Sequence, residues 1–348
     1  MKSLMTISCN RPAGEANLFL YRRRGDGSFT PLGSTDAGLH PSYHLYNPDH
    51  RVVYVVNECR EEFHGRGGSI KTCRVTPEGF QMDGEVSSGG DDPCFLLMDP
   101  GRRFLICTNY SSSSLSIFPL DTRGMTGPAV QVFTWEGRGL RDDRQERSHP
   151  HSACFTPDGR FLLVPDLGCD LIRVFQWEGA EAPLNERPDL AVSIVPGSGP
   201  RMMAFIPGTN RAWVVNELRN SGTCFHYNPD AEDPLDWVKE ISLLPPYWSP
   251  GEESTASHLF CTENYCLFSL RGPDNLALVK DGLVGFCESG GRGPRFFLAD
   301  PEHHRLYTAW QYSRRISEYS LSETGDLQLI GHLMELPEPT CMALIPEN

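Results

Sequence analysis

The sequence predicts an all-β chain folded as a seven-bladed β-propeller with four antiparallel strands in each blade. The main evidence is a pattern that recurs six times, in which two apolar runs are joined by a Pro-Asp-type turn and end in a polar pair. In every copy the first residue and an Asn-like position lie sixteen residues apart, and the copies begin at residues 41, 93, 150, 200, 254 and 294. Units of roughly 40–57 residues that each hold four strand-like runs are typical of propeller blades.

The two chain ends are predicted to share the seventh blade. A seventh start at Pro339 is followed by a single strand-like run, and three such runs (residues 4–10, 16–24 and 29–34) precede the first repeat. Joining them completes a four-stranded blade and closes the ring, which removes the open sheet edges that a linear array would expose. The rival architecture, two β-sandwich domains, predicts neither the shared register nor the closure. We therefore expect one domain over residues 1–348.

The composition fits this fold and excludes several classes of function. With Gly 33 and Pro 28 the chain is rich in turns, as many short strands require. Its 45 acidic residues outnumber 31 Lys and Arg, which gives a net charge of −14. A chain this acidic repels phosphate backbones, so we expect neither nucleic acid nor an anionic membrane as a partner. A local basic cluster can still bind one small anionic ligand.

The twelve cysteines are predicted to be free thiols in the core. They are scattered, mostly within apolar runs such as FLICTNY, and none forms the Cys-x-x-Cys motif of zinc and redox sites. The N-terminal segment MKSLMTISCNRP lacks the apolar stretch of a signal peptide, and no run approaches the roughly 18 apolar residues that span a membrane. We therefore expect a cytoplasmic protein.

Two repeat positions are predicted to bring polar side chains together at one mouth of the channel, because the first strand of each blade lines that channel. The position after each repeat start holds Ser42, Cys94, His151, Arg201, Thr255, Arg295 and Thr340. The position after the Asn-like residue holds Glu58, Tyr110, Leu167, Glu217, Arg271 and Gln311. The alternative is that these polar ends only complete strand termini, as we expect of Asn57, Asn109 and Asn216.

Four of these residues, from three consecutive repeats, are the types that an acid/base site needs. His151 and Glu217 can transfer protons. Arg201 and Arg271 can hold an anionic oxygen or stabilise a developing oxyanion. His149 lies two residues before His151, and we expect it to share the same strand face and either to support the site residues or to contact the substrate. The remaining candidates for substrate binding are Arg295, Gln311 and Glu58.

The chain resembles a known family, most specifically from Arg144 to Leu218. The matching stretches are RQERSHPHSACFTPDGRFLLVPDLG, PGSGPRMMAFIP and VVNEL, and they resemble the seven-bladed lactonases, which include propeller-type 6-phosphogluconolactonases and fungal carboxymuconate cyclases. The resemblance spans all seven repeats and implies a site of one His, one Glu and two Arg, which fall on His151, Glu217, Arg201 and Arg271. The chain departs from the pattern in its fifth repeat, which has no starting proline, and at Leu270 and Trp310, where Asn is usual.

Three functions remain open from the sequence. The first, implied by the resemblance, is a lactonase without metal or cofactor that opens a small anionic sugar lactone, with 6-phosphogluconolactone as the expected substrate. The second is an isomerase of the carboxymuconate cyclase type, which would use the same four residues. The third is a non-catalytic propeller that binds other proteins, although the Trp-Asp repeat ending common in such platforms is absent. We expect no metal site, since His303 and His304 lie in a turn without spaced ligands, and the oligomeric state is left open.

Overall fold

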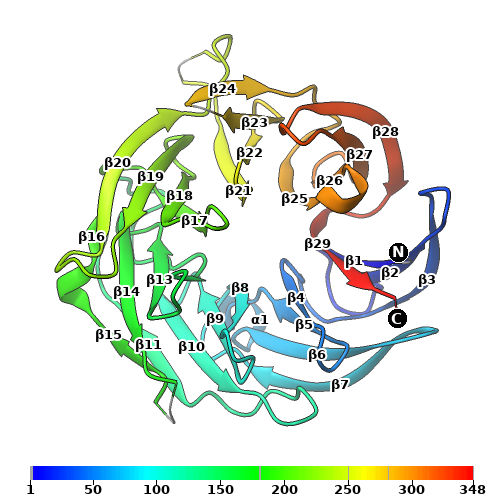
Figure 1. Ribbon diagram of the computed structural model, residues 1–348. Coiled ribbons are helices and arrows are strands. Elements are labelled where there is room, and N and C mark those ends of the chain that lie inside the picture. Colours follow the sequence, from blue (N-terminus) through cyan, green and yellow to red (C-terminus); the bar gives the residue numbers. More distant parts are fainter. Residues whose placement is uncertain (1–2, 180–181, 250, 281, 348) are drawn as a thin grey trace.

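The computed structural model describes residues 3–179, 182–249, 251–280 and 282–347, which form seven antiparallel β-sheets around a central channel (Figure 1). Each sheet is one blade, with one edge strand next to the channel and the other at the rim. This confirms the predicted seven-bladed propeller. We number the blades from the first repeat, so that blade 7 contains both chain ends. No helix in the described ranges is long and apolar enough to cross a membrane.

In blades 1 to 4 the strands follow one another from the channel outward. Blade 1 contains β4 (His44–Asn47), β5 (Val52–Asn57), β6 (Ser69–Thr76) and β7 (Gly79–Ser87). Blade 2 contains β8 (Pro93–Met98), β9 (Phe104–Asn109), β10 (Ser114–Pro119) and β11 (Gln131–Thr134). Blade 3 contains β12 (Cys154–Phe155), β13 (Phe161–Asp166), β14 (Leu171–Trp177) and an outer strand in two pieces, β15 (Leu184–Glu186) and β16 (Val192–Ser193). Blade 4 contains β17 (Pro200–Phe205), β18 (Arg211–Asn216), β19 (Ser221–Tyr227) and β20 (Leu235–Ser242).

The remaining blades complete the ring. Blade 5 contains β21 (Thr255–Cys261), β22 (Cys266–Arg271), β23 (Asn275–Lys280) and β24 (Leu283–Phe286). Blade 6 contains β25 (Pro294–Asp300), β26 (Arg305–Trp310), β27 (Arg315–Leu321) and β28 (Leu327–Glu335). Blade 7 contains β29 (Pro339–Pro346) next to the channel, then β1 (Ser3–Cys9), β2 (Leu18–Arg23) and β3 (Phe29–Thr35). The helical segments of the described chain are α1 (Glu61–His64), η1 (Pro188–Leu190) and η2 (Pro301–His303).

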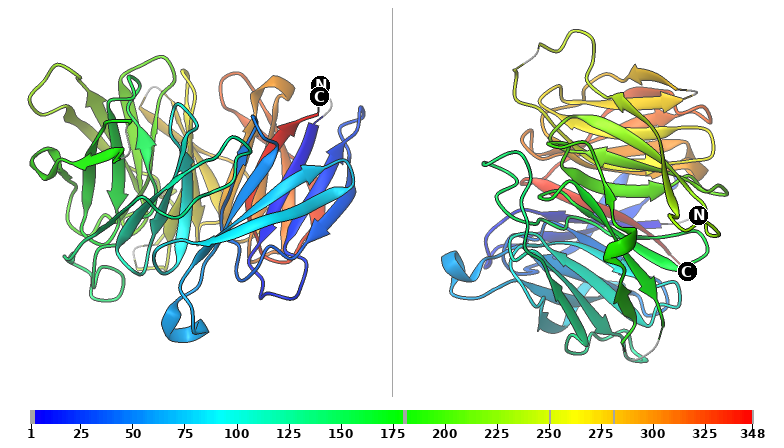
Figure 2. Two further views of the ribbon diagram at one scale, coloured as in Figure 1. Left: turned by 90° about the horizontal axis from the view of Figure 1, so that it is seen from below. Right: turned by 90° about the vertical axis from the view of Figure 1, so that its left-hand side faces the viewer.

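The chain ends close the ring as the sequence predicts. β29 pairs antiparallel with β1, in a continuous register from Ser3 opposite Pro346 to Ser8 opposite Cys341. The two ends lie side by side in both views of Figure 2, and α1 projects from the opposite face of the molecule. Because blade 7 takes strands from both ends of the chain, its sheet depends on residues that are far apart in the sequence.

Apolar side chains fill the space between neighbouring blades, because each sheet is apolar on both faces. Between blades 3 and 4, for example, Phe161 and Leu163 belong to one buried cluster with Met203 and Val214. All twelve cysteines are free, and nine of them are buried, as predicted for core thiols.

A β-bulge at the start of the inner strand orients the residue that follows each starting proline. In blade 4, Pro200 pairs with Asn216 and Met202 pairs with Val215, so Arg201 is an extra residue between two pairs. The same register shift occurs in blades 2, 6 and 7, where the extra residues are Cys94, Arg295 and Thr340. A bulge redirects the extra side chain, and here these side chains line the channel.

The register predicted for blade 5 is wrong by two residues. Ala256 rather than Ser254 pairs with Leu270, so the residue equivalent to Arg201 is Ser257 and not Thr255. The cause is a shorter turn between β21 and β22. Thr262 N–H donates to Tyr265 O there, whereas the corresponding bond in blade 4 joins Ile206 N–H to Arg211 O. A fixed sixteen-residue spacing assumes equal turns, and blade 5 has no starting proline to mark its first strand.

Candidate active site

The residues after the starting prolines converge on one small cavity inside the channel, which we call the channel chamber. Its volume is ≈ 30 Å³, and its wall includes Ser42, Cys94, His151, Arg201, Arg295 and Thr340. The repeat register therefore brings together side chains that are up to 298 positions apart in the sequence. A cavity of this size has room for about one water molecule and not for a sugar.

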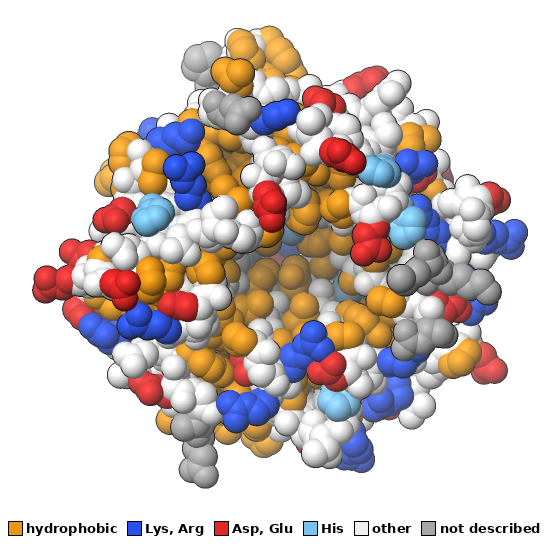
Figure 3. Space-filling view, viewed as in Figure 1, with side chains coloured by type: hydrophobic (Ala, Val, Ile, Leu, Met, Phe, Trp, Pro, Cys, Tyr) orange, Lys and Arg blue, Asp and Glu red, His pale blue; other side chains and the backbone are white. Residues whose placement is uncertain are grey.

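Two larger hollows lie at the channel mouth, on the face that carries α1. The mouth pocket has a volume of ≈ 650 Å³, and its wall includes Arg144, Arg271 and Arg292. The side hollow has a volume of ≈ 380 Å³, and its wall includes Glu62 of α1, Tyr110 and Arg144. Arg144 thus belongs to both walls. On the opposite face, many of the side chains around the opening of the channel are hydrophobic (Figure 3).

Glu217 is the centre of a buried cluster of charges at this mouth, the Glu217 cluster, made with Arg144, Arg201 and Arg271. Its backbone N–H donates to Gly199 O at the end of β18, which places the side chain at the mouth. Glu217 Oε1 lies 2.7 Å from Arg144 Nη2, and Oε2 lies 2.7 Å from Arg201 Nε and 3.2 Å from Arg271 Nη2. Burial alone would raise the pKa of Glu217, but the three guanidinium charges outweigh burial and hold that pKa well below its ordinary value of 4.5. The carboxylate is therefore ionised at neutral pH.

Two of the guanidinium groups in this cluster have buried donors without acceptors. Neither Arg201 Nε nor Arg271 Nε makes a hydrogen bond within the described chain. Arg201 Nε is close to the Glu217 carboxylate, but its N–H does not point at the oxygen, so this contact is an ion pair and not a hydrogen bond. Burial, partly offset by Glu217, lowers the pKa of Arg201 to about 10, which leaves the group charged at pH 7. Three guanidinium groups around one carboxylate leave a surplus of positive charge, which favours an anion bound nearby.

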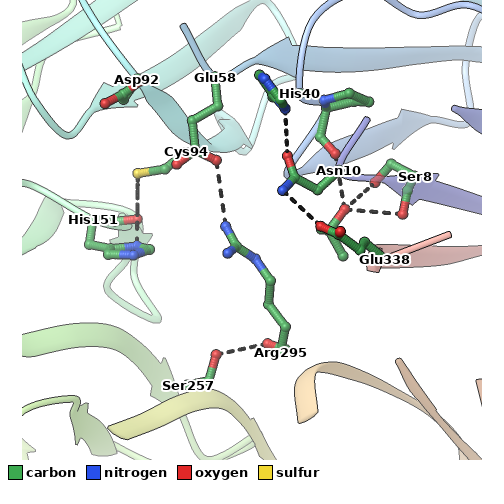
Figure 4. Close-up of polar contacts among 12 residues, drawn as sticks. Ser8, Asn10, His40, Glu58, Asp92, Cys94, His151, Ser257, Arg295 and Glu338 are labelled. Atoms are coloured by element: carbon green, nitrogen blue, oxygen red, sulfur yellow. Dashed lines mark hydrogen bonds and ion pairs between the residues drawn. The ribbon is translucent and has the colours of Figure 1, made fainter. Parts of the chain in front are cut away.

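His151 is a neutral base next to this cluster. Burial and the positive charge of Arg201 hold its pKa well below the ordinary value of 6.5, and Glu217 only partly opposes them. Its Nδ1 lies 3.8 Å from Cys94 Sγ (Figure 4), and its ring meets the Tyr110 ring edge-on at 5.5 Å. Burial raises the pKa of the Cys94 thiol to about 12, so this neighbour stays protonated. No hydrogen bond joins His151 to Glu217 within the described residues.

Arg144 is a member of the site that the sequence reasoning missed. It lies in the long connection between β11 and β12, outside every repeat position. Gln145, which is fully buried, holds this connection in place: its side chain accepts from Leu140 N–H and Arg141 N–H and donates to Leu167 O. The only signal in the sequence is that Arg144 begins the stretch with the most specific family resemblance.

The structure places two predicted substrate contacts away from the Glu217 cluster. His149 lies in the wall of the side hollow, where its Nδ1 is 2.9 Å from Tyr110 O and its Nε2 is 3.2 Å from Glu146 Oε2. It also stacks on the Tyr110 ring at 4.1 Å. The shared strand face predicted for His149 and His151 is not formed, because β12 begins only at Cys154. Gln311 is buried at the end of β26, where its backbone N–H donates to Gly293 O.

The other two predicted contacts form a separate ion pair across the channel. Arg295 Nη2 lies 3.5 Å from Glu58 Oε2, and Ser257 Oγ donates to Arg295 O at 2.8 Å (Figure 4). Arg295 also lines the channel chamber, together with His151. The pair is therefore close enough to His151 to influence its charge, but it does not contact Glu217.

No metal centre is formed in the described part of the chain, where no three His, Cys, Asp or Glu side chains are arranged to hold a metal ion. His303 instead pairs with Asp300, at a distance of 2.9 Å between Nδ1 and Oδ2.

Comparison with known proteins shows the family to which the chain belongs. The 6-phosphogluconolactonase of Bacillus subtilis (strain 168) is 26% identical over 322 residues, which cover 88% of this chain and 87% of that protein. The 6-phosphogluconolactonase of Yersinia pseudotuberculosis serotype O:3 is 29% identical over 309 residues, with 86% of each chain covered. The periplasmic gluconolactonase PpgL of Pseudomonas aeruginosa has a similar structure, with a TM-score of 0.88 and 25% identity over 99% of both chains. The model of the family described as lactonase, 7-bladed β-propeller, matches residues 8–344, and the chain belongs to that family.

Proposed function

We propose that the protein is a lactonase for small anionic sugar lactones and that its substrate is 6-phosphogluconolactone, which it hydrolyses to 6-phosphogluconate. The observation that carries this proposal is the Glu217 cluster, in which three guanidinium groups around one buried carboxylate leave a surplus of positive charge at the channel mouth. The names of the relatives support the reaction class, since those of Bacillus and Yersinia are 6-phosphogluconolactonases and PpgL is a gluconolactonase.

His151 is the group that activates water in this proposal. The low pKa keeps its imidazole neutral at pH 7, and a neutral imidazole can accept a proton. In the tautomer that carries hydrogen on Nδ1, this N–H points to Cys94 Sγ and leaves Nε2 free to take the proton of water. The channel chamber next to His151 has room for that water. His151 then returns the proton to the ring oxygen as the lactone C–O bond breaks.

Arg201 and Arg271 stabilise the oxyanion that forms when water attacks the lactone carbonyl. The Glu217 carboxylate holds both guanidinium groups in place, and Arg271 lines the mouth pocket, so their positive charge is fixed before the reaction begins. Glu217 is a positioning residue in this scheme. Its carboxylate holds three guanidinium groups, so its negative charge is used to position them.

The test is hydrolysis above the spontaneous rate, measured as proton release from 6-phosphogluconolactone, unphosphorylated gluconolactone and carboxymuconate lactone. We expect the phosphorylated lactone to be preferred and its kcat/KM to fall with added salt, because the mouth attracts anions. His151→Ala should lower kcat by about 10²–10⁴-fold without changing the melting temperature, whereas His303→Ala, outside the channel, should have wild-type activity. Absence of hydrolysis of any lactone would overturn the proposal.

We also propose that the protein acts in the cytoplasm, where its twelve thiols stay reduced. PpgL, which has a similar structure, is periplasmic. Cell fractionation with a marker for each compartment tests this directly, and a periplasmic signal would contradict it.

A further inference from the structure

We propose that Arg144 recognises the phosphate group of the substrate and thereby separates phosphorylated from neutral sugar lactones. The inference rests on the proposed lactonase function and adds to it a specificity residue that lies outside the repeats. It follows from where a lactone can bind, from the free donors of Arg144, and from the charges of the two hollows at the mouth.

The lactone ring has to bind in the mouth pocket. The channel chamber, at ≈ 30 Å³, holds a water molecule but no sugar, whereas the mouth pocket has ≈ 650 Å³. Arg271 lines the inner part of this pocket, and Arg201 lies behind it on the same carboxylate of Glu217. A carbonyl directed at these two guanidinium groups leaves the far end of the sugar pointing outward. Both lactones, phosphorylated or not, present the same carbonyl to the same two arginines.

Arg144 is the member of the Glu217 cluster that faces outward. Its side chain is 34% exposed, against 10% for Arg201 and 15% for Arg271. Only its Nη2 is engaged, at 2.7 Å from Glu217 Oε1 and 3.4 Å from Tyr110 Oη. Its Nε and Nη1 have no hydrogen-bond partner in the described chain. Gln145 holds the backbone of this connection and Glu217 holds Nη2, so the remaining N–H groups form a preorganised site for an anionic oxygen.

The charges of the two hollows indicate on which side of Arg144 the phosphate binds. The side hollow has five carboxylates in its wall against three arginines, which disfavours an anion. The mouth pocket has four carboxylates and four arginines. One of those carboxylates is paired with one of those arginines, Asp143 with Arg141 at 2.7 Å, which leaves three of each. The mouth pocket therefore offers the more positive surface, and it is also the pocket that contains Arg271.

The test compares Arg144→Gln with the wild type on 6-phosphogluconolactone and on gluconolactone. Glutamine keeps an N–H donor for Glu217 and removes the charge. We expect kcat/KM for the phosphorylated lactone to fall on the order of 10- to 100-fold, mainly through KM, as for loss of a hydrogen bond to a charged group. The neutral lactone should change by only a few-fold, and Arg144→Lys should restore part of the loss. Arg201→Ala, in contrast, should impair both lactones alike.

The matched control is Arg147→Gln, an equal charge change in the same connection, on a residue that lines the side hollow and not the mouth pocket. It should leave the preference unchanged. An equal loss of activity on both lactones in Arg144→Gln would overturn the inference. A wild type that hydrolyses both lactones equally well would also overturn it. In both cases the lactonase function would stand. Calorimetry can also measure how tightly 6-phosphogluconate and gluconate bind. This measurement tests phosphate recognition by Arg144 separately from the lactonase function, even if the wild type hydrolyses neither lactone. Binding of the phosphorylated acid that is lost in Arg144→Gln supports the inference, and binding that is unchanged overturns it.

Discussion

Two ion pairs at the channel mouth use the same residue types in the same repeat positions, yet they differ sharply in burial. Arg201 and Glu217, both from blade 4, lie 2.7 Å apart with side chains 10% and 4% exposed. Arg295 of blade 6 and Glu58 of blade 1 lie 3.5 Å apart with side chains 21% and 31% exposed. The repeat therefore places one arginine and one glutamate in each half of the mouth, the half with Glu217 and the half with Glu58. The two pairs nevertheless differ in what surrounds them.

The surroundings decide the chemistry of each pair. Glu217 receives two more guanidinium groups, Arg271 from the next blade and Arg144 from a connection, whereas Glu58 pairs with Arg295 alone within the described chain. Charges attract more strongly when they are buried, and exposed pairs are screened by water and salt. The first half therefore holds a surplus of fixed positive charge around a buried carboxylate, which suits oxyanion stabilisation. The second half holds a single, half-buried ion pair.

The largest expected effect comes from disrupting blade 7, which lies between the blades that carry Arg295 and Glu58. Blade 7 lies between blades 6 and 1, and deletion of residues 1–20 removes β1 and the start of β2. We propose that residues 1–348 form one folding unit, so the truncated chain should lose its cooperative thermal transition throughout, and not only in one half. Circular dichroism melting with limited proteolysis checks this. A truncated chain that melts cooperatively at the wild-type temperature would argue against closure as a source of stability.

The second prediction contrasts the two carboxylates. Glu217→Gln leaves three guanidinium groups facing one another without a counter-charge, so the free energy of unfolding should fall by about 3–5 kcal/mol. Glu58→Gln breaks an exposed pair and should cost about 0–1 kcal/mol. Urea unfolding of both variants measures the difference. Equal losses would mean that burial does not distinguish the two halves.

The third prediction contrasts the two arginines in catalysis. Arg201→Ala removes an oxyanion donor and should lower kcat by about 10²–10³-fold. Arg295→Ala should lower kcat by about tenfold or less, because its guanidinium is partly solvated and paired with Glu58. Steady-state kinetics on the preferred lactone, with melting curves to confirm folding, provides the comparison. Similar losses in both variants would show that the whole ring of channel residues acts as one site.

The part of the site that could be predicted from the sequence is the part that the repeat specifies. The bulge places Arg201 in the channel, and His151 lines the same chamber from the segment before β12. The shared register that brings both residues there is visible without a structure. Thr255 was misplaced because register fails where a turn is two residues shorter. Arg144 could not be predicted, for a different reason. Its position depends on the contacts of Gln145 in an irregular connection, and a repeating sequence pattern carries no information about such contacts.

The smallest expected effect is on the pH dependence of activity. It connects the two halves of the mouth, because Arg295 of one half influences the pKa of His151 beside the other half. Burial, the Arg201 charge and, more weakly, the Arg295 charge lower the pKa of His151, against the opposing influence of Glu217. A general base must be neutral, so activity should persist as the pH falls below 6.5 and decline only at the lower, folded-state pKa.

Arg295→Gln removes one of the charges that disfavour the imidazolium form, so the folded-state pKa of His151 should rise and the acid limb of kcat should move to higher pH. Arg147→Gln, which removes a charge outside the channel chamber, should leave that limb in place. The measurement is kcat against pH for the three proteins, on gluconolactone, so that ionisation of a substrate phosphate does not contribute. A wild-type acid limb at pH 6.5 itself would show that the base is a solvated histidine and not His151, and the two halves of the mouth would then be uncoupled.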